Sequence, residues 1–173
     1  SFVAAEINAE LEGRIQALEK VARSIDQPLL GNPAALQQML EQRPIFQDLF
    51  SAGILALSLD GTAIADVPVE AGRRGTNYSD NEANHIVLTE GRSVIGRPTM
   101  GRKLRQPLFN IVTPIRDARG KVIGALVGVI NLAQPNFLDT IGEHRYGKSG
   151  GYFVVDPQHN LIVTSTDKSR VLQ

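Results

Sequence analysis

The chain has 173 residues, of which 42% are hydrophobic and 21% are charged, a balance typical of a globular domain rather than of a disordered chain. Lys and Arg together number 18, as do Asp and Glu, so no excess of positive charge is present to hold a nucleic-acid backbone. We therefore expect no nucleic-acid partner. The absence of cysteine excludes disulfides, thiolate metal sites and cysteine nucleophiles.

The first segment, about residues 4–25, is predicted to be a helix because its apolar residues recur every three or four positions. The stripe consists of Ile7, Leu11, Ile15, Leu18, Ala22 and Ile25. This spacing is close to that of a coiled-coil seam. Two interpretations stay open. The helix packs one face on its own domain, or its exposed part also forms a homodimer contact through Ile7, Leu11, Ile15 and Leu18.

Helical signals continue to about residue 50. Pro28 and Gly31 end the long helix, and Asn32 is expected to cap a short helix that begins at Pro33. A further turn over residues 45–50 is expected to place its aromatic side chains at the edge of a sheet. The hydrophobic period then changes from 3.6 to 2, which predicts strands over residues 54–59 and 62–65.

The middle of the chain is more polar. Ser79 and Asp80 are expected to cap a helix over residues 81–89, and Gly91 is expected to end it. A short strand follows at residues 93–95. The loop over residues 98–106 and the residue before it carry a basic run: Arg97, Arg102, Lys103 and Arg105. A solvated surface loop is the default interpretation, and an anion-binding lid is the alternative.

Residues 108–115 and 121–132 are predicted to form a hairpin. The second of these strands is apolar on both faces, which is typical of a strand in the middle of a sheet that is covered on both sides. Its two glycines, Gly124 and Gly128, leave room for a helix or a ligand to approach the sheet. Together with the long first helix, these strands predict an α+β fold.

The last part of the chain contains a helical signal over residues 137–141 and a second hairpin over residues 152–163. This hairpin and the one around Asp60 both consist of a strand, an Asp-initiated turn and a strand. The similarity is a weak internal repeat, which we interpret as the beginning of a second copy of the fold.

Taken in order, these motifs resemble the Cache sensor domains of bacterial transmembrane receptors, of the PAS-like double-Cache type. The residues that carry the resemblance include Leu49-Phe50, Leu59-Asp60-Gly61, Gly72-Arg73, the run Gly75–Asp80, Gly96-Arg97-Pro98, the hairpin up to Leu132, Gly147–Tyr152 and Asp167–Arg170. The resemblance implies a long N-terminal helix followed by a five-stranded antiparallel sheet flanked by helices. It also implies a helical segment at residues 1–50, a membrane-distal Cache domain at 51–142 and the start of an incomplete second module at 143–173.

The family resemblance also implies a function. We expect a sensor domain of a membrane-bound histidine kinase, diguanylate cyclase or phosphodiesterase, or chemoreceptor, which binds a small molecule and signals through a helix-mediated homodimer. The fragment is expected to be non-catalytic, to need no cofactor or metal, and to lie on the periplasmic side of the inner membrane, with a membrane span before residue 1. The alternative is a ligand-free module for dimerisation or protein interaction.

The residues expected to line a ligand pocket come from the central loops and strands. They are Tyr78, Asp80, His85, Arg97, Asn110, Thr113 and Asn131. Three of them, Asn110, Thr113 and Asn131, interrupt otherwise apolar strands. Since buried polar groups need partners, these side chains either pair with loop backbone or contact a ligand.

The chain departs from the family pattern at the positions that hold an amino-acid ligand in some members. Where the family has an Arg followed by an aromatic pair, this chain has Asn81, Ala83 and Asn84, and where an Asp often ends the strand it has Asn131. An asparagine cannot supply the charge of either group. From this we expect a ligand other than a standard amino acid.

Overall fold

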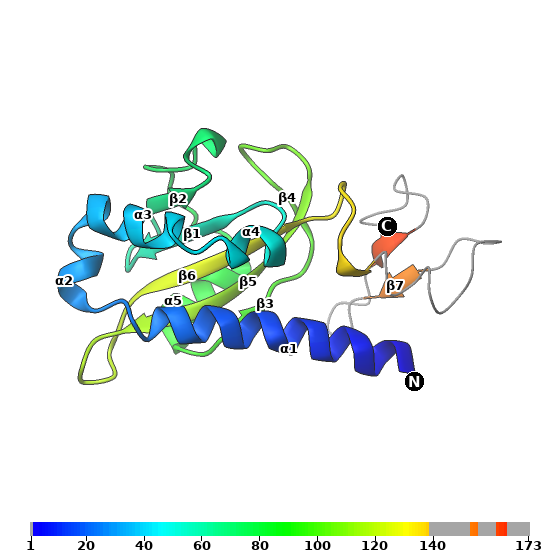
Figure 1. The fold of residues 1–173 in the computed structure, drawn as a ribbon, viewed down its shortest axis with the longest axis horizontal. Coiled ribbons are helices and arrows are strands. Elements are labelled where there is room, and N and C mark those ends of the chain that lie inside the picture. The colour runs from blue at the N-terminus through cyan, green and yellow to red at the C-terminus, as the bar shows by residue number, and fades with distance from the viewer. Residues whose placement is uncertain (1, 139–152, 156–161, 166–173) are drawn as a thin grey trace.

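An antiparallel sheet organises this chain, as seen in a computed structural model that describes residues 2–138, 153–155 and 162–165 (Figure 1). The described helices are α1 (Phe2–Ala22), α2 (Gln27–Leu30), α3 (Pro33–Glu41), α4 (Ile45–Leu49), the short 3-10 helix η1 (Val69–Ala71) and α5 (Glu82–Glu90). The described strands are β1 (Ile54–Ser58), β2 (Ala63–Val67), β3 (Val94–Ile95), β4 (Thr99–Met100), β5 (Pro107–Arg116), β6 (Val122–Asn131), β7 (Phe153–Val155) and β8 (Ile162–Ser165).

The main sheet has the strand order β2-β1-β6-β5-β3, and β4 also pairs with β5. The expected α+β fold with a long N-terminal helix is confirmed. Five strands were expected and the sheet has six, because Thr99 and Met100, in a predicted loop, pair with Leu108 and Pro107. Strand β6 lies between β1 and β5, as its two apolar faces predicted.

Helices α1, α3 and α4 cover one face of the sheet, and the core between them includes Leu18, Leu36 and Phe50, which are almost completely buried. Burying one such side chain stabilises the fold by about 1.5–3 kcal/mol. On α1, the stripe residues Ile7, Leu11 and Ile15 are partly buried and pack against the same core. The apolar stripe of the helix therefore faces its own sheet.

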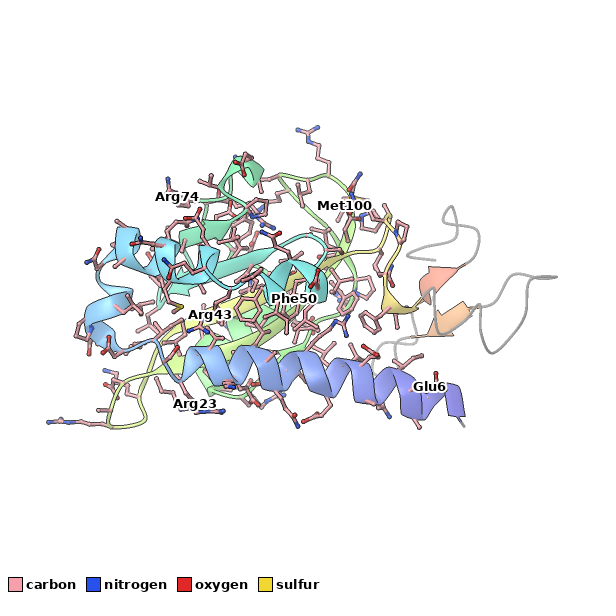
Figure 2. All side chains as sticks on the ribbon, in the orientation of Figure 1. Glu6, Arg23, Arg43, Phe50, Arg74 and Met100 are labelled. Carbon is pink, nitrogen blue, oxygen red and sulfur yellow. The ribbon has the colours of Figure 1, made fainter. Side chains whose placement is uncertain are left out.

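Phe50 lies over the centre of the sheet and not at its edge, which corrects the expectation for this one of the two aromatic residues of 45–50. A Cβ atom added at Gly128 on β6 would come within 2.3 Å of the Phe50 ring. The space left by this glycine is therefore filled by an aromatic ring. Figure 2 shows Phe50 in the interior, while Arg23 and Arg74 lie on the outside of the molecule.

Helix α5 covers the opposite face of the sheet, where Ala83, Val87 and Leu88 belong to a second core cluster and the helix packs on strands β3, β5 and β6. Its cap differs from the prediction. Asn81 is the capping residue, and its Oδ1 accepts a hydrogen bond from the Asn84 backbone N–H at 3.2 Å. Ser79 is instead bound through its backbone N–H to Asn77 Oδ1 at 2.9 Å. Gly91 ends the helix in a left-handed conformation, as predicted.

Strands β7 and β8 pair antiparallel in a separate two-stranded sheet, as predicted for the second hairpin over residues 152–163. The turn between them, residues 139–141 of the predicted helix and most of the proposed second module lie outside the described residues. Among the helices that the structure describes, none is both long enough and apolar enough to cross a membrane.

Candidate functional site

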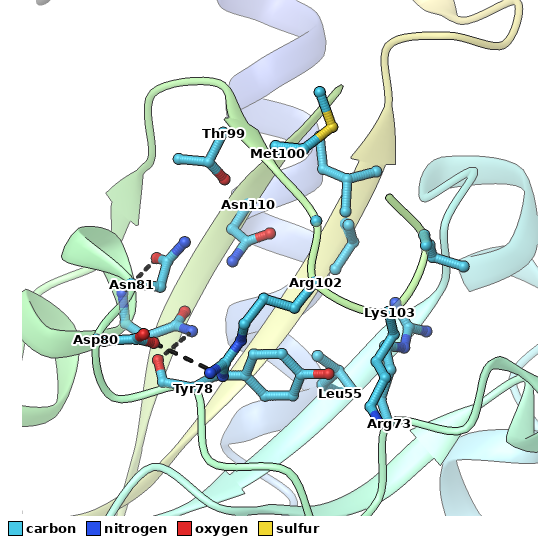
Figure 3. Close-up of a pocket in the computed structure, with 15 residues that line it drawn as sticks. Leu55, Arg73, Tyr78, Asp80, Asn81, Thr99, Met100, Arg102, Lys103 and Asn110 are labelled. Carbon is cyan, nitrogen blue, oxygen red and sulfur yellow. Dashed lines mark hydrogen bonds and ion pairs between the residues drawn. The ribbon is translucent and has the colours of Figure 1, made fainter. Parts of the chain in front are cut away.

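A pocket of about 230 Å³ lies on the α5 face of the sheet, beneath the segment that connects β4 to β5 (Figure 3). Its floor consists of Leu55 from β1, Val129 from β6, and Leu108 and Asn110 from β5. The remaining lining residues are Arg73, Tyr78, Asp80, Asn81, Asn84, Thr99, Met100, Gly101, Arg102, Lys103 and Leu104. The pocket therefore combines an apolar floor with walls rich in amides and cations.

Arg102 fastens the covering segment to the chain that leads into α5. Its guanidinium carbon lies 4.9 Å from the centre of the Tyr78 ring, and its Nη2 lies 3.7 Å from Asp80 Oδ1. It also donates a hydrogen bond to the Asn77 carbonyl. The Arg102 side chain is half exposed and that of Asp80 is 73% exposed, so the ion pair adds only a modest stabilisation.

A second cation, Arg73, is buried in the pocket wall and is already neutralised. Its side chain forms an ion pair with Asp66 at 2.9 Å, and its backbone N–H donates to the same carboxylate at 2.7 Å. Gln37 on α3 holds the Asp66 backbone from the other side with two hydrogen bonds. Since Arg73 has this partner, it contributes a fixed dipole to the pocket rather than an unpaired positive charge.

Tyr78 contributes a phenol that stays neutral at physiological pH. Burial raises the pKa of Tyr78, and this rise is opposed by the nearby Thr76 hydroxyl and the charges of Arg73 and Arg102. Its buried Oη makes no hydrogen bond of ordinary geometry with the described residues, and the same is true of Asn84 Oδ1. Buried polar atoms without partners are rare in native proteins, so two of them in one pocket lining call for an explanation.

The structure brings together three of the seven residues expected at the site: Tyr78, Asp80 and Asn110. His85 is exposed on α5 and Arg97 is exposed beside Glu82 at 3.8 Å, and neither borders the pocket. Thr113 faces the opposite side of the sheet, because it lies three positions from Asn110 and side chains alternate along a strand. There it hydrogen bonds with the Ser93 hydroxyl at 2.9 Å.

Asn131 lies two residues beyond Val129 on the same side of β6, but it does not border the pocket. Its amide is occupied by neighbouring groups. The Nδ2 donates to Gln106 Oε1, and the Oδ1 accepts from the Ala133 backbone N–H at 2.9 Å. This corresponds to the first alternative for polar residues in these strands, in which the side chain pairs within the protein.

Some residues that line the pocket were not predicted from the sequence. Asn81 and Asn84 were considered only as departures from a family pattern, although residues three apart at the start of a helix share a face. Arg102 and Lys103 belong to the basic run whose default interpretation was a solvated loop. The loop is therefore only partly solvated, since Arg102 and Lys103 border the pocket while Arg97 and Arg105 do not, and anion binding stays a prediction.

The comparisons with known proteins agree with this architecture. The family model dCache_1, described as a Cache domain, matches residues 1–173. No protein with a curated description matches the chain.

Several solved structures share the fold. The ligand-binding domain of the Pseudomonas aeruginosa PAO1 amino acid chemoreceptor PctC, in complex with GABA, is 22% identical with a TM-score of 0.73, over 99% of this chain and 77% of that one. The ligand-binding domain of the Pseudomonas fluorescens chemoreceptor CtaA, in complex with L-serine, is 21% identical with a TM-score of 0.75, over 99% and 71%. The sensor domain of the V. cholerae histidine kinase DctB is 16% identical with a TM-score of 0.72, over 98% and 64%.

These structures correct one expectation. We expected a ligand other than a standard amino acid, because the chain departs from the family pattern at Asn81, Ala83, Asn84 and Asn131. That expectation was wrong, since structures of this fold hold GABA and L-serine. Although position 81 is an asparagine, the pocket is lined by two cationic side chains, Arg102 and Lys103, from the segment between β4 and β5.

Proposed function

This chain belongs to the dCache_1 family of Cache domains, and from this premise we propose that it is the sensor domain of a membrane-bound signalling receptor. Its ligand is a small molecule that binds in the pocket between the sheet and the segment over residues 99–104. The observation that carries the proposal is the pocket lining, in which cations and amides surround an apolar floor. A concave site with a few convergent polar groups is the usual form of a small-molecule site.

We propose further that the ligand is an amino acid or a close relative of one. Arg102 and Lys103 offer a guanidinium and an ammonium to a carboxylate, a pairing that is short and strong when it is partly shielded from water. Leu55, Leu108 and Val129 offer an apolar surface to the rest of the molecule. Pockets for drug-sized ligands usually measure about 300–1,000 Å³, so a pocket of about 230 Å³ suits a compact metabolite.

The receptor that contains this domain is proposed to hold it on the extracytoplasmic side of the inner membrane. Residues 51–142 form the membrane-distal module in this proposal, and residues 143–173 begin a second one. The output is that of a histidine kinase, a cyclase or phosphodiesterase, or a chemoreceptor. Ligand binding tightens the covering segment, and the change passes to α1, whose partly exposed residues Ile7 and Leu11 remain available to a second copy of the chain.

The test is a binding screen of the 173-residue chain against the common amino acids and GABA by thermal shift and calorimetry. A ligand present at 100 times its Kd stabilises the folded state by about 2.7 kcal/mol, which raises the Tm by roughly 5–10 °C in a chain of this size. The variant Arg102→Met is expected to weaken binding by roughly 10- to 100-fold, because a hydrogen bond to a charged group is lost.

The matched control is Arg74→Met, because Arg74 is exposed and lies outside the pocket lining. It removes the same charge and is expected to leave the affinity unchanged. A folded chain that binds no amino acid at millimolar concentration contradicts the proposal and favours the ligand-free interaction module.

A further inference from the structure

One of the two buried polar atoms without a partner in the pocket lining is the side-chain oxygen of Asn84. The residue is only 1% exposed, and its Oδ1 has no hydrogen-bond partner among the described residues. An amide oxygen that is removed from water without a replacement partner destabilises the protein. Because Asn84 belongs to the pocket lining, a ligand is able to supply the missing partner.

The orientation of this amide is determined by its other end. The Nδ2 donates to the Tyr78 carbonyl at 3.1 Å, and a carbonyl can only accept. Exchanging the nitrogen and oxygen of the amide would place two oxygens against each other, so the unpaired atom is the oxygen. The backbone of Asn84 is also held, since its N–H is bound by the capping residue Asn81. The acceptor is therefore rigid before any ligand arrives.

The charges around the pocket indicate what kind of donor fits. Among the described residues that line the pocket, Asp80 is the one carboxylate, and it is mostly exposed and paired with Arg102. The cations Arg102 and Lys103 attract the acidic end of a ligand to the covering segment. A ligand with both a carboxylate and an amino group can pair its carboxylate with these two cations. The buried acceptor that remains for its amino group is the neutral amide of Asn84.

We propose that Asn84 Oδ1 accepts a hydrogen bond from the amino group of the ligand, and that Asn84 thereby distinguishes amino acids from simple carboxylic acids. This inference rests on the proposed function, that the pocket binds an amino acid. It assigns recognition of the amino group to an uncharged side chain on α5.

The test compares pairs of probes that differ only in the amino group: L-alanine and propionate, L-serine and 3-hydroxypropionate, and GABA and butyrate. Affinities are measured by calorimetry for the wild-type chain, for Asn84→Ala and for the control His85→Ala, which changes the next residue of α5 outside the pocket lining. In the wild type, we expect loss of the amino group to weaken binding by about 10-fold or more. In Asn84→Ala, the difference within each pair should fall to about 2-fold, while His85→Ala keeps it.

The outcomes separate the two proposals. If no amino acid binds to the folded wild type, the proposed function fails. If amino acids bind but Asn84→Ala discriminates within each pair as well as the wild type does, this inference fails and the proposed function stands. If Asn84→Ala does not fold, the wild-type chain still gives a decision, because equal affinity for the two members of each pair overturns the inference.

Discussion

Asp66 and Arg73 form an ion pair inside the pocket wall, with Arg73 Nη2 2.9 Å from Asp66 Oδ1 and the two side chains 0% and 4% exposed. Each partner makes further hydrogen bonds. Asp66 also accepts from the Arg73 backbone N–H, and Arg73 Nη2 lies 3.4 Å from the Val67 carbonyl. The pair joins the end of β2 to the segment that leads to Tyr78, so it determines where one wall of the pocket stands.

Replacing Asp66 with Ala is expected to lower the free energy of unfolding by about 3–5 kcal/mol, because Arg73 would remain buried without a counter-charge. Urea denaturation of the two chains measures the difference. The double variant Asp66→Leu with Arg73→Met is the control, since it removes both charges together and should recover a large part of the loss. If the single variant is as stable as the wild type, the ion pair is not the element that holds this wall.

Gly128→Ala is expected to destabilise the fold by about 1–3 kcal/mol or more. The added methyl group would lie within 2.3 Å of the Phe50 ring, and Phe50 is almost completely buried. Thermal unfolding gives the size of the effect. A second variant, Gly128→Ala with Phe50→Leu, removes the clash and should be more stable than Gly128→Ala alone. The opposite order would show that the ring does not occupy this position.

Gly13→Ala is expected to have the opposite sign. Gly13 lies within α1, its backbone is helical, and an added Cβ atom would meet nothing within 4 Å among the described residues. Alanine in an exposed helix interior is more stable than glycine by about 0.5–1 kcal/mol. A rise in the midpoint of urea unfolding checks this prediction, and a fall would mean that the outer face of α1 is covered in solution.

The ionisation of Tyr78 is expected to occur above the ordinary tyrosine pKa of about 10, because burial raises the pKa of this phenol. The folded state thus favours the neutral form. Its contribution to the free energy of unfolding is fully present below the unfolded-state pKa and is lost as the pH rises through the higher folded-state pKa. The measurement is an alkaline spectrophotometric titration of the wild type minus that of Tyr78→Phe, in which the other two tyrosines cancel. A difference curve with its midpoint at or below 10 would contradict the prediction.

Much of the fold could be predicted from local patterns. The apolar run of β6 indicated its central place, the three- and four-residue spacing on α1 indicated a helix, and Asn32 and Gly91 were recognised as helix boundaries. The cap of α5 was misplaced because Ser79, Asp80 and Asn81 are all good capping residues and only the tertiary contacts of Asn77 decide between them. The position of Phe50 depends on packing between distant segments, which no local pattern contains.

The site was predicted less completely than the fold. Tyr78, Asp80 and Asn110 were identified because they are polar residues in or beside the predicted strands. Thr113 could have been placed on the other face from Asn110, because side chains alternate along a strand. Arg73, Arg102 and Lys103 could not be placed in the pocket in advance, because their positions depend on how two loops fold over the sheet. The orientation of the Asn84 amide could not be predicted either, because it follows from the hydrogen bond to the Tyr78 carbonyl.

Strand β6 separates the pocket from α1, α3 and α4, and two consecutive residues of this strand face the two sides. Val129 forms part of the pocket floor, while Gly128 lies beneath the Phe50 ring. Only the thickness of one backbone lies between them, and a close-packed interior has little compressible space. A ligand that displaces Val129 by a fraction of an ångström therefore also shifts the surface on which Phe50 rests. In the proposed function, this shared wall is one route by which an occupied pocket affects the layer of α1, α3 and α4.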